Sequence, residues 1–244
     1  QSCCTSSPAA RLAGYEDTQQ HTEAAGASFG CGNPLAFAGV KTGDTVLDLG
    51  SGAGLDLLLA AEQTGATGRV IGVDMTDDMI AAARRHALDA GATQIEVRRG
   101  LIEDLPVRDG QADWVISNCV INLSPDKPAV CAELARVMKP GGQFSISDIV
   151  VQDLPEWIRD SAAAWSACVA GAISEQDYLQ GLRGAGLTEV EVTDRIVYEP
   201  SQLRAILCED IPGLDLEPAM IDALLKEHAG KVWSARFSGR KSTS

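Results

Sequence analysis

Strand-like and helical segments alternate along the chain from residue 45 onward, and this alternation most constrains how the chain folds. Apolar or alternating runs typical of strands occupy residues 45–49, 70–74, 95–99, 113–117 and 143–148. Apolar residues at helical spacing lie between several of these runs, as in residues 55–62 and 77–90. Strands joined through a helix pair in parallel, with a right-handed crossover. The pattern therefore predicts an α/β fold around a doubly wound parallel sheet.

A further helix is expected between the fourth and fifth strands. Ser124 is a suitable N-cap, Pro125 would take the first helical position, and apolar residues through Met138 keep helical spacing. The Lys-Pro-Gly-Gly sequence at residues 139–142 would then end this helix and lead into the next strand.

The composition changes near residues 150–155, which we interpret as a domain boundary. We expect an N-terminal arm and substrate loop in residues 1–40, the sheet domain in residues 41–152, and a smaller α+β substrate domain in residues 153–244. The last part is predicted to contain helices at residues 156–172, 174–185 and 217–229, and strands at residues 189–196 and 232–239.

The overall charge and composition exclude several classes of partner. A net charge of -14 argues against nucleic acid, because a polyanion would be repelled. No apolar run reaches the roughly 18 residues of a membrane-spanning helix, so no membrane partner is expected. The first ten residues lack the layout of a signal peptide, and the seven cysteines include no CxxC pair. These features favour a reducing cytoplasm, and the three histidines lack the spacing of metal ligands.

A glycine-rich loop, Gly50-Ser51-Gly52-Ala53-Gly54, follows the first predicted strand. Glycines let the backbone turn tightly and approach a ligand, while the next helix directs its free N–H groups toward the same crevice. A dinucleotide-binding loop would carry its third glycine at position 55, where this chain has Leu55. The spacing therefore favours a nucleoside with an amino-acid tail over one with a pyrophosphate.

Residues at the ends of the next strands complete a predicted cofactor site. Asp74 is placed to accept hydrogen bonds from both ribose hydroxyls, the segment with Ile102 to enclose an adenine, and Asn118 to bind a methionine moiety. Together with the loop they resemble class I methyltransferases, which implies S-adenosylmethionine as the cofactor and a Rossmann-like sheet. The residues predicted to surround it are Asp48, Gly50, Ser51, Gly52, Gly54, Asp74, Met75, Ile102, Glu103, Asn118 and Val120.

Three further segments narrow the resemblance. They read Gly-Cys-Gly-Asn-Pro at residues 30–34, Ser-Asn-Cys-Val-Ile-Asn-Leu-Ser-Pro-Asp-Lys at residues 117–127, and Cys-Val-Ala-Gly-Ala at residues 168–172. With the Lys-Pro-Gly-Gly sequence, they resemble the arsenite methyltransferases from about Cys3 to about Gly186. The resemblance implies methylation of arsenite, and also of methylarsenite, as a detoxification reaction carried out by a monomer.

The resemblance also assigns roles to individual cysteines. It makes Cys31 and Cys168 the ligands of trivalent arsenic, and it makes Cys3-Cys4 a pair that exchanges a disulfide with a substrate-site cysteine during turnover. Glutathione or thioredoxin would serve as the thiol reductant. We interpret the two other cysteines in this part of the chain, Cys119 and Cys131, as structural thiols.

Cysteine ligands suit this chemistry, because trivalent arsenic is soft and thiolates are the softest ligands that a protein offers. Sulfur atoms that hold arsenic in a pyramid leave its lone pair directed outward. The lone pair attacks the sulfonium methyl in line, so that no general base is required and catalysis consists of positioning and desolvation.

The sequence departs from the family pattern at the C-terminus. Many members carry a third arsenic-binding cysteine in a strand that resembles residues 233–237, and the matching position here is Ala235. Cys208 is a candidate third thiol, although the surrounding segment 201–226 is longer than usual for the family. Otherwise the third ligand would be water, hydroxide or a small thiol such as glutathione.

Three other functions remain open at this point. The nearest is a small-molecule C- or O-methyltransferase of the quinone-biosynthesis type, which shares the cofactor motifs but does not need Cys31 and Cys168. A nicotinamide oxidoreductase is disfavoured by Leu55 and by the segment around Asn118. A metalloid sensor would use the cysteines but has no reason to keep a methyl-donor site.

Overall fold

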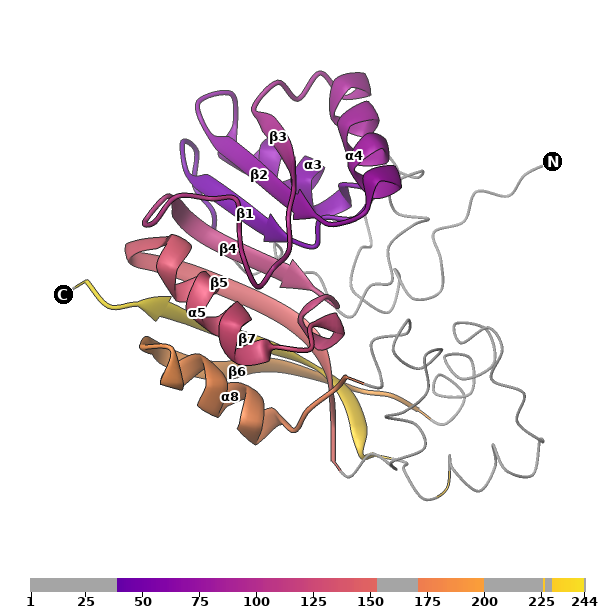
Figure 1. The fold of residues 1–244 in the computed structure, drawn as a ribbon, viewed down its shortest axis with the longest axis vertical. Helices are drawn as coiled ribbons and strands as arrows, with labels where there is room; N and C mark the ends of the chain where they lie inside the picture. Colours follow the sequence, from indigo (N-terminus) through magenta and orange to yellow (C-terminus); the bar gives the residue numbers. More distant parts are fainter. Residues whose placement is uncertain (1–38, 153–170, 200–225, 227–229, 244) are drawn as a thin grey trace.

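The computed structural model describes residues 39–152, 171–199, 226 and 230–243, and within these residues it contains one seven-stranded sheet (Figure 1). The strand order across the sheet is β3-β2-β1-β4-β5-β7-β6. The strands are β1 Thr45–Leu49, β2 Arg69–Asp74, β3 Ile95–Arg99, β4 Ala112–Asn118, β5 Met138–Val151, β6 Leu187–Val197 and β7 Val232–Lys241.

The first five strands pair in parallel, as the alternation of strands and helices predicted. β1 pairs with both β2 and β4, while β3 and β5 add to the two outer sides. β7 then pairs with β5, and β6 with β7, both antiparallel. The sheet is therefore mixed rather than wholly parallel.

The two antiparallel strands come from the part of the chain predicted to form a smaller substrate domain, and they extend the first sheet. They cover the side of β5 that β4 leaves open, which protects the backbone N–H and C=O groups of this long strand. The domain boundary near residue 152 remains a prediction, because residues 153–170 and 200–225 lie outside the described part.

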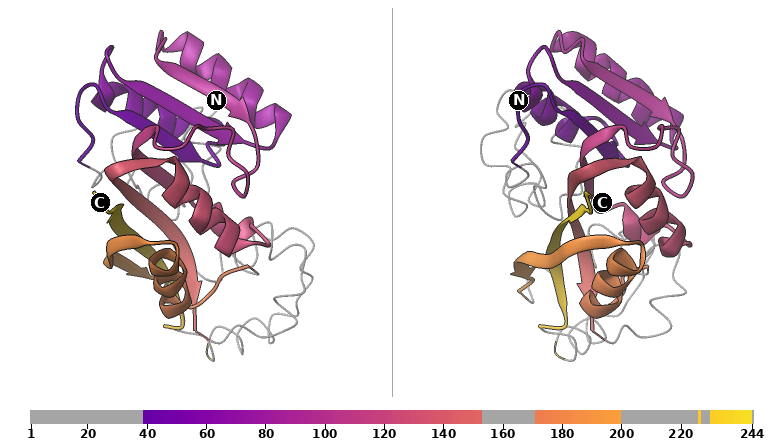
Figure 2. Two further views of the ribbon diagram at one scale, coloured as in Figure 1. Left: turned by 60° about the vertical axis from the view of Figure 1, so that its left-hand side comes forward. Right: turned by 90° about the vertical axis from the view of Figure 1, so that its left-hand side faces the viewer.

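Helices cover both faces of the sheet (Figures 1 and 2). On one face, α3 Leu55–Thr64 and α4 Asp77–Asp89 pack their apolar residues against Val46 and Trp114. On the other face, α5 Lys127–Val137 and α8 Glu175–Gly184 pack against a larger core that includes Phe237. None of the described helices is long and apolar enough to cross a bilayer.

Two local predictions around α5 are wrong. Asp126, not Ser124, caps the helix, because the Asp126 carboxylate accepts a hydrogen bond from the N–H of Ala129 at 3.0 Å. The Lys-Pro-Gly-Gly sequence lies inside β5 rather than before it, since the helix ends at Val137 and the strand begins at the next residue. A register shift between Ala112 and Trp114 accommodates this early start.

The C-terminal elements are confirmed where they are described. Helix α8 matches the prediction for residues 174–185, and its cap Ser174 accepts a hydrogen bond from the N–H of Asp177 at 3.1 Å. The two predicted strands correspond to β6 and β7. The predicted helices at 156–172 and 217–229 fall almost entirely outside the described residues.

A stacked aromatic pair joins α8 to the antiparallel half of the sheet. The rings of Tyr178 and Phe237 lie 4.2 Å apart between centroids, with an angle of 8° between their planes. Phe237 is fully buried in the same core as Leu182. This contact fixes the C-terminal strand against the helix layer.

We predict that Phe237→Ala lowers the free energy of unfolding by about 3–5 kcal/mol, because it leaves a cavity beneath the Tyr178 ring. Leu88→Ala is the matched control, since Leu88 is 79% exposed and its truncation should change stability by less than about 0.5 kcal/mol. Urea denaturation followed by circular dichroism measures both. Equal effects of the two substitutions would contradict the assignment of Phe237 to the core.

Candidate active site

The glycine loop lies at the carboxyl edge of the sheet, which we define as the edge where β1, β2 and β4 end at Leu49, Asp74 and Asn118. The N–H groups of Gly50 and Ser51 donate to the carbonyl of Val73, at 2.8 and 3.1 Å. These bonds tie the loop to the neighbouring strand. The loop therefore has a fixed shape before any ligand binds.

Two glycines of the loop are required for different reasons. Gly50 has φ +68°, and a Cβ added there would lie 2.4 Å from Cγ2 of Val120. Gly52 also has a left-handed φ, +50°, but a Cβ at this position would meet no atom of the described residues within 4 Å. Position 50 thus lets the loop pack against Val120, while position 52 faces open space that a ligand can enter.

Asp74 is held in place by backbone groups on both sides. One carboxylate oxygen accepts from the N–H of Gly52 and the other from the N–H of Thr76, each at 2.9 Å. A carboxylate oxygen has two acceptor sites, so each retains capacity for a hydroxyl donor. The carboxylate is thus oriented at the end of β2, where a ribose was predicted.

Asp48 and Ser51 lie deeper than their prediction as cofactor residues suggested. Asp48 is 2% exposed, and burial raises the pKa of its carboxyl well above the ordinary value, with further contributions from the negative charges of Asp56 and Asp74. Ser51 is also buried, beneath Gly72, where a Cβ would lie 2.7 Å from the Ser51 hydroxyl oxygen. Contact of either residue with a cofactor stays a prediction.

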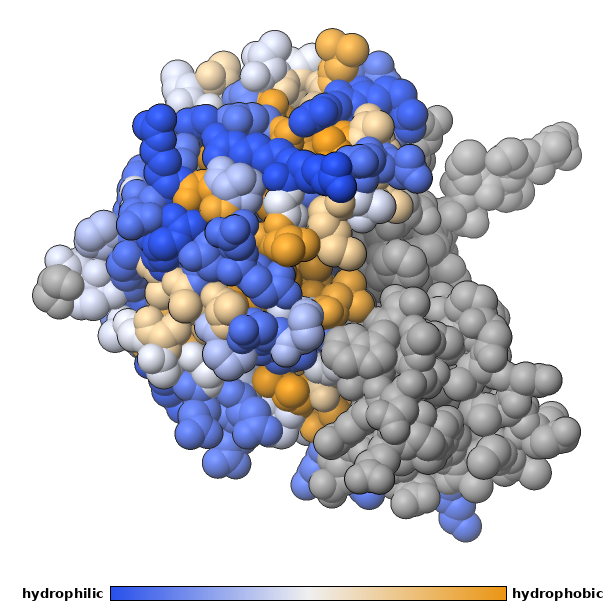
Figure 3. Space-filling view, in the orientation of Figure 1, coloured by the Kyte–Doolittle hydropathy of each residue, from blue (hydrophilic) through white to orange (hydrophobic). Residues whose placement is uncertain are grey.

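Apolar side chains are exposed beside Asp74. Met75 is 65% exposed and Leu101 is 52% exposed, although both are large hydrophobic residues. Figure 3 shows apolar surface gathered near the point where β4 ends in Figure 1, while polar residues cover much of the rest of this face. Ile102 is mostly buried in the core, and Glu103 accepts a hydrogen bond from the Ser124 hydroxyl. Contact of either residue with an adenine stays a prediction.

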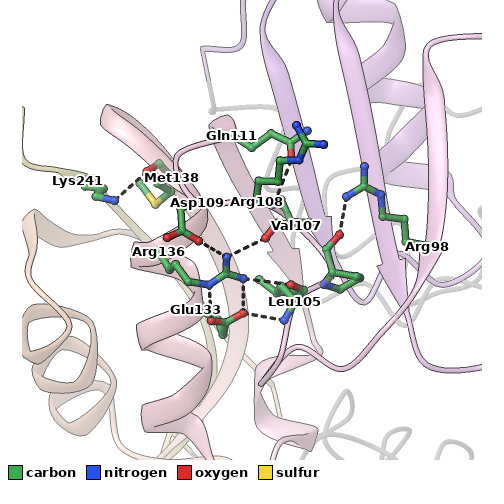
Figure 4. A network of polar contacts seen from close by, with 11 residues as sticks. Arg98, Leu105, Val107, Arg108, Asp109, Gln111, Glu133, Arg136, Met138 and Lys241 are labelled. Atoms are coloured by element: carbon green, nitrogen blue, oxygen red, sulfur yellow. Dashed lines mark hydrogen bonds and ion pairs between the residues drawn. The ribbon is translucent and has the colours of Figure 1, made fainter.

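Arg136 of α5 holds residues 105–107, in the connection between β3 and β4, through hydrogen bonds (Figure 4). The guanidinium donates to the carbonyls of Leu105 and Val107, at 3.1 and 2.8 Å. It also makes a two-pronged pair with Glu133, with both distances at 2.6 Å. The Glu133 carboxylate in turn accepts from the N–H of Leu105 at 2.7 Å. The network anchors the connection between β3 and β4 to the helix layer.

Cys119 is a site residue whose interpretation as a structural thiol needs correction. It directly follows Asn118 at the carboxyl edge, is 6% exposed, and has a left-handed φ of +59°. Its N–H donates to the carbonyl of Ser147 at 2.9 Å. Cys119 is disulfide-bonded. The signal in the sequence was its position immediately after a strand that ends at the ligand-binding edge.

Cys131 behaves as the structural thiol that was predicted. It is buried and free, and burial raises the pKa of its thiol to about 11, so that it stays protonated and unreactive. The remaining predicted cysteines lie outside the described residues: Cys3, Cys4, Cys31, Cys168 and Cys208. Within the described part, no group of three His, Cys, Asp or Glu side chains is arranged to hold a metal ion. Ala235 is fully buried in β7, opposite Asp148.

A separate cavity of about 1030 Å³ opens over the antiparallel half of the sheet, and Ser145, Asp194 and Arg236 are among the residues that line it. None of the predicted cofactor residues lines it. The candidate cofactor site, formed by the glycine loop and Asp74, is therefore separate from this cavity.

Comparisons with known proteins agree with the geometry of the carboxyl edge. The sequence profile of a family described as a methyltransferase domain matches residues 40–186. An arsenic (III) S-adenosylmethionine methyltransferase from Chlamydomonas reinhardtii has a solved structure that matches with a TM-score of 0.72 and 32% identity, covering 96% of this chain and 73% of that one. The chain belongs to this arsenic methyltransferase family.

Curated members of the arsenic methyltransferase family are similar over most of the chain. The arsenite methyltransferase of Halobacterium salinarum is 42% identical over 199 residues, which are 79% of this chain and 51% of that protein. That of Aquipseudomonas alcaligenes is 38% identical over 185 residues, 72% of this chain and 53% of that protein. The chain thus spans about half the length of these curated relatives.

We predict that Arg136→Lys lowers the free energy of unfolding by about 1–2 kcal/mol, because lysine cannot reproduce the fork that reaches two carbonyls and Glu133. Arg99→Lys is the control, since Arg99 is 69% exposed, pairs with Asp77 at 3.3 Å and should lose less than about 0.5 kcal/mol. Guanidinium denaturation compares the two. Similar losses in both variants would mean that the fork does not hold the 105–107 segment.

Proposed function

We propose that this chain transfers a methyl group from S-adenosylmethionine to trivalent arsenic held by cysteine thiolates. The observation that carries the proposal is the placement of Cys119 directly after Asn118, on the edge of the sheet where Gly52 and Asp74 form a ligand-ready loop. The similarity to arsenite methyltransferases supports the choice of arsenic over other methyl acceptors.

The described residues fit the cofactor. The open space above Gly52 leaves room for a ligand against bare backbone, and Asp74 presents a fixed carboxylate to the ribose hydroxyls. Met75 and Leu101 offer exposed apolar surface to an adenine ring, and Asn118 ends β4 on the side proposed for the methionine moiety. The cofactor supplies a sulfonium methyl group, whose transfer releases a neutral thioether.

Cys119 joins Cys31 and Cys168 in the proposed set of arsenic ligands. A disulfide requires that a second cysteine sulfur reach bonding distance of Cys119. After reduction, two thiols that can come this close can also bind the same arsenic atom, which is strongly thiophilic. We therefore prefer Cys119 over Cys208 or a small thiol as the third arsenic ligand. With Cys119 in this role, the site does not require a cysteine at position 235, where this chain has alanine.

The disulfide of Cys119 supports the proposal that the reaction uses a thiol reductant. Two equivalents of a thiol such as glutathione, or one thioredoxin dithiol, convert the disulfide to two cysteine thiols and are themselves oxidised to a disulfide. Each methyl transfer to the arsenic lone pair also raises arsenic formally from the trivalent to the pentavalent state, which must be reduced before another transfer. We propose Cys3 and Cys4 as the pair that relays these electrons.

The proposed chemistry makes no demand for a general base, because the arsenic lone pair is available without loss of a proton. The protein contributes orientation, by holding the arsenic in line with the methyl group, and exclusion of water from the sulfonium. As parts of the same proposal, we infer that the reaction serves detoxification of arsenicals, in the cytoplasm, by a monomer.

We predict that Gly52→Ala weakens binding of S-adenosylhomocysteine at least about tenfold, because the added methyl group occupies the open space above the loop. Gly91→Ala is the matched control: Gly91 also has a positive φ, +64°, no atom in the described part of the chain lies within 4 Å of an added Cβ, and it lies outside the loop. Both variants should lose about 1–2 kcal/mol of stability. Isothermal titration calorimetry measures both affinities. Equal affinities for the two variants would contradict the proposal that the ligand binds above Gly52.

We predict that Cys31→Ser, Cys168→Ser and Cys119→Ser each abolish methylation of arsenite but leave S-adenosylhomocysteine binding within about threefold of the wild type. Cys131→Ala serves as the control, since its thiol is buried in the core and should be dispensable for transfer. The assay follows labelled methyl transfer to arsenite with glutathione present and identifies the arsenical products.

The outcomes of this assay separate the candidate functions. Normal activity in any one serine variant would remove that cysteine from the ligand set. A wild-type protein that methylated a quinone or phenol but not arsenite would refute the arsenic proposal in favour of the quinone-type alternative.

A further inference from the structure

A buried carboxylate, Asp148 of β5, lies behind the turn that carries Cys119. Asp148 has no exposed surface. Its carboxylate accepts from the backbone N–H of Asn122 at 3.1 Å and from that of Ile149 at 3.0 Å. It also accepts from the side-chain amide of Asn122 at 2.8 Å and from the hydroxyl of Tyr178 at 3.2 Å. Four donors thus converge on a single buried acid.

Asn122 is the partner that connects this acid to the active site. It lies in the short 3-10 helix η3 Ile121–Leu123, three residues after Cys119, and is itself fully buried. Its side-chain amide also donates to the carbonyl of Ile149 at 2.7 Å. Both the backbone and the side chain of Asn122 are therefore fixed to β5.

The segment from Cys119 to Asn122 is attached to β5 at both of its ends. Cys119 donates its N–H to the carbonyl of Ser147 at 2.9 Å, and Asn122 binds the next residue, Asp148. Between these two anchors the chain leaves β4 through the left-handed conformation of Cys119, which is unfavourable for a residue with a Cβ. The anchors supply the hydrogen bonds that keep this conformation.

The same segment also shapes the cofactor loop. Val120 lies between the two anchors and packs so closely over Gly50 that no side chain would fit at that position. A displacement of the turn would therefore move the Cys119 thiol and open the packing against the glycine loop together.

We propose that Asp148 is a positioning residue, which acts through Asn122 to hold Cys119 and Val120 at the carboxyl edge of the sheet. The effect of Asp148 on catalysis rests on the proposed function, whereas its role in positioning the turn does not. Asp148 is fully buried and accepts its hydrogen bonds from Asn122, Ile149 and Tyr178, so its effect is exerted through the turn.

The ionisation of Asp148 gives the proposal a distinct signature. Burial raises the pKa of its carboxyl to about 7, although the donors from Asn122, Ile149 and Tyr178 and the charge of Lys127 oppose this rise. Lys127 of α5 donates to the carbonyls of Asn122 and Ser124, at 3.4 and 3.1 Å. Among the described residues, two further titratable groups lie near this cluster: Tyr178 of α8, whose pKa burial raises well above its ordinary value, and Cys131 of α5, whose thiol has a raised pKa of about 11.

Stability and ligand binding should respond to this ionisation in opposite directions. The folded-state pKa is raised above the unfolded one, so the contribution of Asp148 to stability falls as the pH rises from about 4 to about 7. The carboxylate accepts from all four donors better than the neutral acid does, so the turn is held more firmly as the pH rises through about 7. Cofactor affinity should therefore increase where stability decreases.

The test compares Asp148→Asn with Tyr178→Phe, in the full chain and between about pH 6 and pH 8. Asp148→Asn keeps the size of the side chain but turns a donor toward the N–H groups of Asn122. Tyr178→Phe removes a donor to the same carboxylate from the α8 side and leaves the turn untouched. Binding of S-adenosylhomocysteine is measured by calorimetry, stability by urea denaturation, and labelling of reduced Cys119 by a maleimide with mass spectrometry.

We expect Asp148→Asn to weaken S-adenosylhomocysteine binding about tenfold, to remove the rise in affinity with pH, and to speed maleimide labelling of Cys119 by about the same factor. Tyr178→Phe should keep the wild-type affinity at the upper end of the pH range and shift the midpoint of the pH dependence upward, since the lost donor had lowered the pKa of Asp148.

Two results would overturn the proposal. One is an Asp148→Asn variant that loses stability but keeps the wild-type pH dependence of binding and the wild-type labelling rate. The other is a Tyr178→Phe variant that changes labelling of Cys119 as much as Asp148→Asn does. Failure of the wild type to methylate arsenite would refute the proposed function instead, and the labelling of Cys119 would still decide the role of Asp148.

Discussion

The parallel hydrogen-bonding register of β1 with β2 and β4 is the constraint on which the rest of the site depends. It brings Leu49, Asp74 and Asn118 to one edge, although these residues are far apart in the sequence. At that edge the chain leaves each strand, and the residues at each of these three strand exits can contribute to a binding site. The first exit is a glycine loop, the second an oriented carboxylate, and the third a turn with a cysteine. The convergence of these three exits is what supports the proposal that a methyl donor and a soft acceptor meet at this edge.

Much of this edge follows from the sequence, because strand ends in a parallel sheet are determined by local alternation of strand and helix. The loop at Gly50 and the carboxylate of Asp74 lie where the alternation predicted them. The cap of α5 was assigned to Ser124 instead of Asp126 because both side chains can accept a backbone N–H, and only the observed start of the helix distinguishes them. The extension of the sheet by β7 was missed for another reason. The paired residues of β5 and β7 are 81 (Val151 and Val232) to 97 (Gln143 and Arg240) positions apart in the sequence, so no local pattern records the pairing.

Cys119 and Asp148 show the limits of sequence reasoning at the level of single side chains. A cysteine that packs as a small apolar residue and one that forms a disulfide have the same sequence context. An aspartate near the end of a strand normally indicates exposure, yet Asp148 is fully buried because four donors surround it. In both cases the decisive information is the identity of neighbours contributed by other segments. The cysteines assigned from family resemblance, Cys31 and Cys168, lie outside the described residues and remain predictions.

The antiparallel pairing of β7 with β5 has a consequence for how the chain is made. β5 is complete once residue 151 has left the ribosome, but its partner begins at Val232. During the intervening synthesis one side of a fourteen-residue, mostly buried strand has no hydrogen-bonding partner. The nascent protein therefore passes through a stage in which β1 to β5 can already pair while the side of β5 that β7 covers in the finished fold is exposed. Transient exposure of such an edge favours aggregation during synthesis, a cost that the stability of the finished fold does not report.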